Sequence, residues 1–395
     1  MRVRIDELKT RRAMHARLVV VTLCVAGMLQ AQSFPSGSTG ADGALNITAP
    51  GVTTFTATPV GGGSIYNFTT INVATGSTLR LSGAVFTSPL YFLAQGAVTI
   101  AGTIDLSGGN GTAPTTSQQR TGGPTTPGAG GYGGGAAAFG ADAALSGLGP
   151  LGGAAYGGCF GDGGDGGFSG NQFLVPLVGG SGGAGYYPSG GAGGGALLVA
   201  SSVSITVTGT ISATGGTDAT NTNGGAGAGG GIRLVAPTIT GNGAISAAGG
   251  YSHYNCRGAN GTVRLEAFQN TFTGSGGGNV YTATPVNLFI PAVSSQPSIM
   301  VTSIGGVAVS PNPTGSFTVP DVLVNSSSPL TVAIKASNIP LGTIPTIYFS
   351  TENYPDQKIA ASAGLAGTVA SSTTTATVTL NPGYSIGYIV ATWTQ

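Results

Sequence analysis

Apolar and hydroxyl-bearing residues alternate along several short segments of the chain. From Ile205 to Ala213, apolar residues or glycine occupy every second position, and serine or threonine fills the positions between them. A period of two predicts a β-strand with one buried face and one hydroxyl-lined face. The same apolar positions recur at 98–106 and 239–247, so the chain is predicted to contain structural repeats.

Equivalent residues of the copies are predicted to lie directly over one another. The alignment places Ile205 in register with Val98 and Ile239. A preceding strand of each copy contributes a further equivalent set, which is Leu198, Leu234 and Leu265. Glycine at a strand position indicates a tight bend or a close backbone approach. One such set is expected to form a column of turns: Gly102, Gly209 and Gly243.

The copies differ in length at only one place. The spacing is 36 residues from Gly195 to Gly231 and 30 from Gly231 to Gly261, and the variation falls in the Gly-rich connection. Stacked short strands with insertions at one corner predict an all-β fold, a short right-handed parallel β-helix (β-solenoid) with long Gly-rich loops. The alternative is a β-sandwich of hairpins, which does not require like residues in register between distant copies.

The first 31 residues have the features of a secretory signal. Six Lys or Arg residues precede an uncharged apolar run at 18–29, and Ala31 ends a small-residue cleavage site. We therefore expect a secreted, extracellular or cell-surface protein. The remaining chain has seven basic and ten acidic residues and no later run of 18 apolar residues, so neither nucleic-acid binding nor a membrane span is expected.

The N-terminal β-type segments resemble a known class of repeat protein. Residues 68–73 and 79–81 are expected to form the opening coil. Their pattern is similar to the start of filamentous adhesin and autotransporter-passenger β-helices, in which an early strand caps the open end. Over residues 60–270 the glycine tracts also resemble secreted bacterial Gly-rich repeat proteins. The resemblance implies a structural or adhesive role.

Glycine tracts dominate a long insertion near 109–195. A segment of this composition cannot bury a conventional core, so loop or disorder is expected. The alternative is polyproline-II-like packing beside the β-solenoid. Four tyrosines would then serve as packing points: Tyr132, Tyr156, Tyr186 and Tyr187.

The pattern changes near Asn287, which divides the exported chain into domains at 32–286 and 287–395. Strand-like runs follow at 298–301, 316–319, 330–334, 346–349, 376–380 and 388–393. This spacing predicts an immunoglobulin/fibronectin-like β-sandwich, similar to the disulfide-free versions appended to bacterial surface proteins. Trp393 is expected to be a core residue of the last strand.

Two cysteines follow the signal, and both fall at the same predicted corner. Cys159 lies in the connection after the first copy and Cys256 in the one after the third. In an oxidising compartment these residues are expected to form a disulfide. The alternative is two separate thiols.

Few residues suggest chemistry, so no catalysis and no cofactor are expected. Asp105 has Ser212 and Ser246 as register partners, so no acidic column forms, and His253 is the only histidine after the signal. Asp162 and Asp165 are weak calcium candidates, because one GDGGDGGF copy cannot build a stacked site. The alternative is a β-helix carbohydrate-active enzyme, a polysaccharide lyase or hydrolase.

Arginines at comparable positions are the remaining candidate site. Arg80, Arg233 and Arg264 each stand between two apolar residues, with Glu266 nearby. They form either a solvated structural ladder or, for Arg233 and Arg264, a contact for an acidic polysaccharide.

The expected function is that of a structural or adhesive protein. Its Ser/Thr-rich faces would contact glycans, cell-surface or matrix polymers, or other copies of the chain. Ice binding is a further hypothesis, because Thr206, Thr208 and Thr210 form a hydroxylated row. Thr238, Thr240 and Asn242 continue this row imperfectly.

Overall fold

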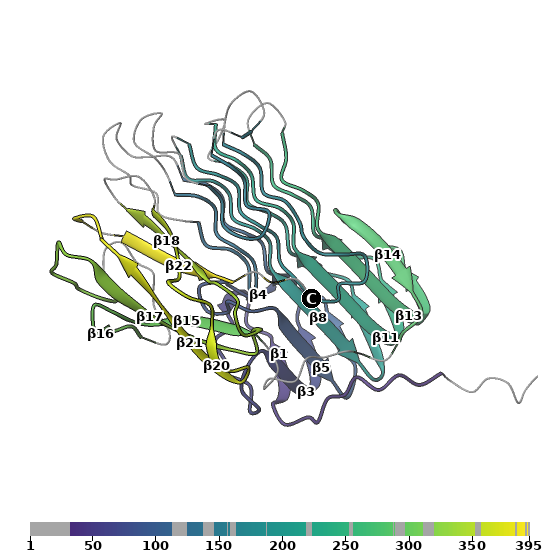
Figure 1. Ribbon diagram of the computed structural model, residues 1–395. Coiled ribbons are helices and arrows are strands. Elements are labelled where there is room, and N and C mark those ends of the chain that lie inside the picture. The colour runs from purple at the N-terminus through teal and green to yellow at the C-terminus, as the bar shows by residue number, and fades with distance from the viewer. Residues whose placement is uncertain are drawn as a thin grey trace, which may run out of the picture. The chain divides into compact units, whose positions relative to one another are not determined.

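The computed structural model shows an all-β protein. It describes residues 32–112, 125–136, 146–155, 157–158, 163–186, 188–218, 223–252, 256–286, 288, 297–310, 320–351, 357–383, 385–391 and 393. These residues form 22 strands and no helix, so no helix in the described part of the chain could cross a membrane (Figure 1). Residues 35–395 belong to one compact unit, which contains every one of these strands.

The largest sheet has nine parallel strands. They are β1 (Gly43–Ile47), β3 (Ile65–Val73), β5 (Leu90–Ala94), β6 (Val98–Ile100), β8 (Ala196–Ser201), β9 (Ser204–Val207), β11 (Gly231–Gly241), β13 (Thr262–Phe272) and β14 (Asn279–Ala283). The long strands β3 and β11 each pair with two shorter strands on one side, so six strands form a closed ring in the order β11-β8-β5-β3-β6-β9. The sheets of this region are therefore parallel, as the repeat pattern predicts.

The ring arises because β3 and β11 run through two ladders of stacked strands. The first ladder contains β5, β8 and β14 with the beginnings of β3, β11 and β13, and the second contains β1, β6 and β9 with their ends. A five-stranded parallel sheet is the third ladder: β2 (Gly51–Thr54), β4 (Ser77–Arg80), β7 (Thr103–Asp105), β10 (Thr210–Ser212) and β12 (Ala244–Ser246). Successive passes of the chain visit the three ladders in the same order.

The predicted stacking of like residues is confirmed. Ile205 pairs in parallel with Val98 on one side and Ile239 on the other. All three side chains are fully buried in one continuous core that the ladders share. The predicted glycine column is also confirmed, because a Cβ on Gly209 would lie 1.9 Å from the carbonyl oxygen of Gly102.

The predicted register is wrong at one position, and the predicted start of the first pass is also wrong. Leu234 pairs with Leu265 but lies opposite Val199, while Leu198 lies opposite Arg233. The glycine spacing overestimates this repeat by one residue, and a one-residue slip moves a side chain to the other face of its strand. The first pass of the chain also begins earlier than predicted, since β1 pairs with β3 and β2 pairs with β4.

The described glycine tracts are ordered, so the expectation of loops is wrong for them. Residues 190–195 are buried, and their backbone N–H groups donate to carbonyl oxygens of three different segments, 106–109, 132–135 and 225–228. The acceptors are those of Leu106, Gly109, Tyr132, Gly135, Gly225 and Ala228. A strand in a sheet has only two neighbours, so these tracts pack against one another in three dimensions. Their polyproline-II-like conformation stays a prediction. These segments run side by side without arrowheads in Figure 1.

The predicted packing points are only partly described. Tyr132 is 38% exposed, and its N–H donates to the carbonyl oxygen of Gly180. Tyr186 is half-buried. Tyr156 and Tyr187 lie outside the described residues.

The strands after the predicted domain boundary form two antiparallel sheets, and they share no sheet with the earlier strands. One sheet contains β15 (Ser298–Ile304), β16 (Val307–Ala308), β17 (Leu330–Ser337), β20 (Ala366–Thr368) and β21 (Ser371–Val378); the other contains β18 (Thr346–Thr351), β19 (Gln357–Ala360) and β22 (Ser385–Val390). Both sheets contribute buried residues to one core. Trp393 follows β22 and packs, partly buried, against a smaller cluster. Asn287 and the run 316–319 lie outside the described residues.

An aromatic cluster fills the core at the first passes of the chain. Tyr66 packs against Phe55, Phe68 and Phe92 with ring centroids 5.1–5.7 Å apart. Its hydroxyl donates a hydrogen bond of 2.6 Å to the carbonyl oxygen of Ala57. Burial and, to a smaller extent, the negative charge of Asp42 raise the pKa of Tyr66 from 10.0 to about 12.

This raised pKa predicts a loss of stability at alkaline pH. The neutral Tyr66 stabilises the fold fully below pH 10, and that contribution is lost as the pH rises towards 12. Thermal unfolding of the Tyr66→Phe variant should therefore depend less on pH across this interval than that of the wild type. Parallel curves for wild type and Tyr66→Phe would contradict the assignment.

The packing of the glycine tracts predicts a strong effect of a single methyl group. A Cβ at Gly193 would lie 1.8 Å from the carbonyl oxygen of Gly180, whereas a Cβ at Gly61 would meet no atom within 4 Å. Gly193→Ala should destabilise the protein by about 1–3 kcal/mol or more, because the backbone around Gly180 would have to move to make room for the methyl group. Gly61→Ala should leave the midpoint of urea unfolding unchanged. Equal midpoints for both variants would show that the tracts do not pack as described.

Candidate functional site

The two arginines proposed as a ligand contact lie in a buried ionic cluster. Arg233 and Arg264 are paired residues of β11 and β13. Both donate to Oε1 of Glu266, from Nε of Arg233 at 2.9 Å and from Nε of Arg264 at 2.6 Å. The side chains of Arg233, Arg264 and Glu266 are 4%, 11% and 0% exposed. The idea of a solvated ladder is therefore wrong for this pair.

The segment 172–174 lies against this cluster. Nη1 of Arg264 donates to the carbonyl oxygen of Gln172 at 3.2 Å, and its guanidinium lies 5.3 Å from the ring centre of Phe173. On the same row of the first ladder, burial raises the pKa of Tyr91, while the positive charge of Arg233 lowers it. Contact of these arginines with a ligand stays a prediction, and their burial argues against it.

Arg80 belongs to a different environment from the other two arginines. It lies in β4 of the third ladder, where it pairs in register with Asp105. Nη1 of Arg80 donates to Oδ2 of Asp105 at 2.7 Å, and Nη2 donates to the carbonyl oxygen of Ser107. The similar local sequences therefore did not indicate equivalent positions. Asp105 does have Ser212 as its other neighbour, and Ser212 has Ser246, as predicted.

The calcium candidates and the cysteines are only partly described. Oδ1 of Asp165 accepts a hydrogen bond of 2.8 Å from the N–H of Ala226, so this carboxylate holds a glycine tract. Asp162 lies outside the described residues, and within those residues no three His, Cys, Asp or Glu side chains are grouped to hold a metal. Cys256 is disulfide-bonded. Its predicted partner, Cys159, lies outside the described residues, and the pairing stays a prediction.

The outward side of the second ladder carries polar side chains stacked in columns. One column runs through six successive strands, and the register places its members directly over one another: Asn46, Asn72, Thr99, Thr206, Thr240 and Thr271. A second column beside it contains Ser204, Thr238 and Gln269. We call these nine residues the hydroxyl face. Neither column contains a charged or an aromatic residue.

The side chains of the long column are available for binding. Among the described residues, none of its four threonine hydroxyls and neither of its asparagine amides makes a hydrogen bond. The third ladder differs, because the hydroxyls of Ser107, Ser212 and Thr214 bond to one another. It also has a shorter threonine column, Thr78, Thr103 and Thr210, which Val52 and Ala244 interrupt at either end.

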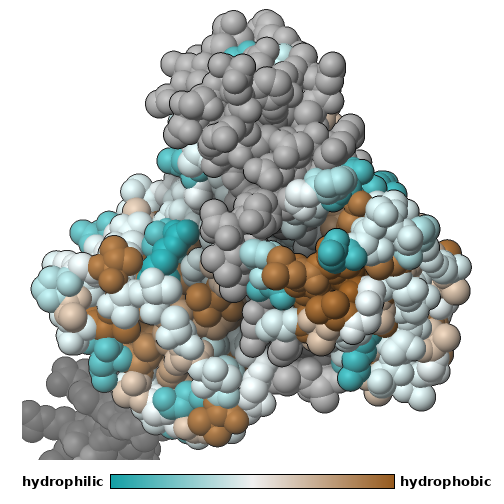
Figure 2. Space-filling view, turned by 90° about the vertical axis from the view of Figure 1, so that its left-hand side faces the viewer, coloured by the Kyte–Doolittle hydropathy of each residue, from teal (hydrophilic) through white to brown (hydrophobic). Residues whose placement is uncertain are grey.

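The hydroxyl face is an uncharged array with two regular spacings. Neighbouring strands repeat every ~4.8 Å, and alternate residues along a strand lie roughly 6.6 Å apart. Figure 2 shows one face of the molecule, on which residues of intermediate hydropathy surround several apolar patches. Such an array can donate and accept hydrogen bonds at fixed intervals.

Sequence reasoning found only part of this face. The predicted row of Thr206, Thr208 and Thr210 follows one strand, but it crosses the turn at Gly209 into the third ladder. The observed column instead crosses the strands and includes Thr99 and Thr271. The period-two register that aligned the apolar positions could have found it, had it been applied to the hydroxyl positions.

Removing the carboxylate of Glu266 from the buried ionic cluster should strongly destabilise the fold. Glu266→Ala leaves two arginines without their shared partner in a buried site, which costs about 3–5 kcal/mol. Asp105→Ala provides the control, because the Arg80–Asp105 pair has side chains that are 22% and 29% exposed and such pairs contribute about 0–1 kcal/mol. Urea unfolding at neutral pH measures both changes. Similar losses for the two variants would contradict the burial of the cluster.

Comparison of the chain with protein-family models, curated proteins and solved structures found no match. Function must therefore be argued from the geometry of the chain's own residues. Among the described residues, the hydroxyl face combines regular spacing with unused hydrogen-bonding groups over six strands, whereas the threonine column of the third ladder spans three.

Proposed function

We propose that this is a secreted or cell-surface structural and adhesive protein, which binds an uncharged polysaccharide through its hydroxyl face without catalysis. The single observation that carries the proposal is the column of six unbonded polar side chains in register. Hydroxyls and amides are suited to sugar hydroxyls, whereas a face without charge offers little to an ionic ligand.

The array favours a polymer over a single sugar. One exposed hydrogen bond contributes only about 0.5–1.5 kcal/mol, because water competes for both groups. A chain that spans several strands forms several such bonds for one loss of translational freedom. The stacked scaffold holds the groups in place, so little further ordering is needed on binding.

We further propose that the three ladders form a right-handed parallel β-helix and that the C-terminal sheets form an immunoglobulin-like domain. The repeated order of the ladders supports the first assignment. Two antiparallel sheets with a common core support the second. The disulfide at Cys256 supports an oxidising location outside the cytosol, together with the signal-like N-terminus.

The alternative function is that of a polysaccharide lyase or hydrolase. Such an enzyme needs an acid and a base that can reach the substrate. Asp105, the outward carboxylate of the third ladder, is already held by Arg80 and by the N–H of Ser107 at 2.9 Å. Incubation with polysaccharides, with and without calcium, would reveal turnover through new reducing ends or the absorbance of unsaturated products.

Removing hydroxyls without changing shape or charge tests the proposal. The triple variant Thr99→Val, Thr206→Val, Thr240→Val should weaken binding to insoluble cellulose, chitin or xylan by roughly 10- to 100-fold. The matched control is Thr78→Val, Thr103→Val, Thr210→Val in the third ladder. Depletion isotherms measure both affinities. Wild-type binding by the first variant, or equal loss in both, would contradict the role of the hydroxyl face.

Ice is a second candidate ligand. The hydroxyl face has no aromatic side chain on which a sugar ring could stack, and its two fixed repeats could order water into a lattice. The same two triple variants distinguish this possibility. Ice binding predicts that the wild type and the third-ladder variant partition into growing ice and lower its growth temperature, while the hydroxyl-face variant does neither.

A further inference from the structure

The two ends of the parallel sheets are closed differently. At the first end, residues preceding β1 bond to the edge of β3. The Asp42 carboxylate accepts from the N–H of Asn67, the N–H of Asp42 donates to the Asn67 carbonyl oxygen at 2.9 Å, and the Ser38 hydroxyl donates to the Phe68 carbonyl oxygen at 2.7 Å. Behind this edge the aromatic cluster fills the core. This end is therefore capped.

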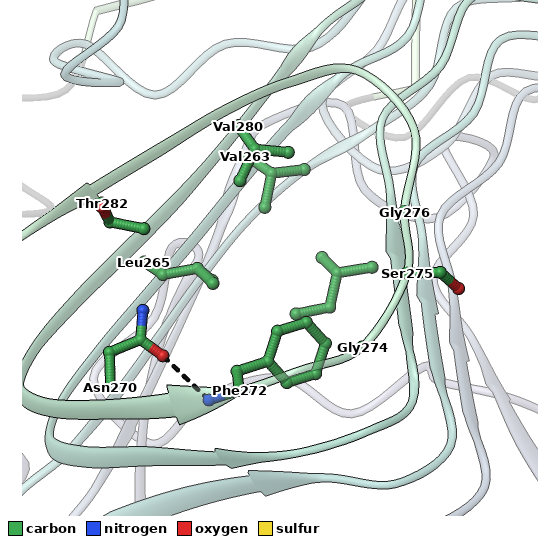
Figure 3. Close-up of a pocket in the computed structure, with 10 residues that line it drawn as sticks. Val263, Leu265, Asn270, Phe272, Gly274, Ser275, Gly276, Val280 and Thr282 are labelled. Carbon is green, nitrogen blue, oxygen red and sulfur yellow. Dashed lines mark hydrogen bonds between the residues drawn. The ribbon is translucent and has the colours of Figure 1, made fainter.

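The opposite end lacks an equivalent cap among the described residues. Its last strand in the first ladder, β14, pairs with β13 alone. Val280 and Tyr281 on this strand are 54% and 37% exposed. Beneath β14 lies a hollow of about 190 Å³ with mainly apolar lining, which includes Val263, Leu265, Phe272 and Val280. Figure 3 shows these side chains converging on the space between β14 and the segment that follows Phe272.

The composition of β14 is unusual for a strand that ends a sheet. Edge strands are normally protected by a charge, a proline, a bulge or a covering segment, because their free backbone groups pair readily with another chain. The sequence of β14, Asn-Val-Tyr-Thr-Ala, has no charge and no proline, and its pairing with β13 is regular. Stacked repeats also require a polar cap at each end to remain soluble.

We propose that two copies of this chain associate end to end, with β14 of one copy pairing antiparallel with β14 of the other. A two-fold axis through Tyr281 would place this residue opposite its own copy and Val280 opposite Thr282 of the partner. The uncharged strand meets no like-charge repulsion in this arrangement. Both hollows would be closed by the same contact.

The cap at the first end favours a two-fold dimer over a filament. Head-to-tail stacking would require β14 to pair with the edge of β3, which Ser38 and Asp42 already occupy. The free edge of β14 can therefore pair only with the free edge of β14 in a second copy. A contact between identical patches closes after two copies.

A lysine in β14 tests this dimer in the full chain. Sedimentation equilibrium over a wide concentration range should show a wild-type dimer, while Val280→Lys should raise the dissociation constant by roughly a hundredfold or more, since lysines would enter the contact without partners. The matched control is Val52→Lys, because Val52 is 72% exposed on β2 at the capped end. A monomeric wild type, larger filaments, or equal dissociation of both variants would overturn the proposal.

A crosslink provides a second test that does not depend on the folding of the lysine variant. Directly opposite residues of an antiparallel pair have Cα atoms about 4.5–5.5 Å apart, which suits a disulfide. Under mild oxidation Tyr281→Cys should form a covalent dimer, and Val52→Cys should not. Absence of the Tyr281→Cys crosslink would overturn the two-fold pairing, whatever the fate of Val280→Lys.

Discussion

Parallel hydrogen bonding between equivalent residues of successive passes is the constraint on which the rest of the structure depends. It places Ile205 between Val98 and Ile239, so a residue that suits one pass must suit its neighbours. The same register that stacks apolar side chains inside stacks hydroxyls outside. The core and the hydroxyl face are therefore opposite sides of the same strands. A register shift of one residue would expose the apolar side chains and turn the hydroxyls inward.

The glycine tracts extend this principle to segments without side chains. Around residues 190–195 the neighbouring chains approach so closely that a Cβ at most positions would overlap a carbonyl oxygen. Backbone hydrogen bonds to several tracts replace the contacts that side chains make in an ordinary core. This explains how a region with little hydrophobic side-chain volume is nevertheless buried and ordered, and why its glycines cannot be read simply as flexible linkers.

The sequence was most informative where a period of two was unbroken. It predicted the pairing of Ile205 and the column at Gly209, because each requires only local alternation and a constant repeat. It misplaced Leu198 by one residue, since the glycine spacing does not equal the strand repeat. It also treated Arg80 as equivalent to Arg233, because three-residue sequences do not specify which ladder a strand joins. Burial of an arginine depends on distant segments such as 172–174, which no local pattern reveals.

The distribution of charge follows from the same stacking. A charged residue repeated at ~4.8 Å in every pass would face like charges on both sides, which is unfavourable. Where Arg233 and Arg264 do stack in register, the shared carboxylate of Glu266 compensates their charges, and Asp105 lies beside Arg80 in the third ladder. Neutral hydroxyls carry no such restriction and can occupy every level of a column. A long, uniform binding surface on this scaffold is therefore most readily built from threonine and asparagine, and such a surface is suited to a ligand that is itself uncharged and repetitive.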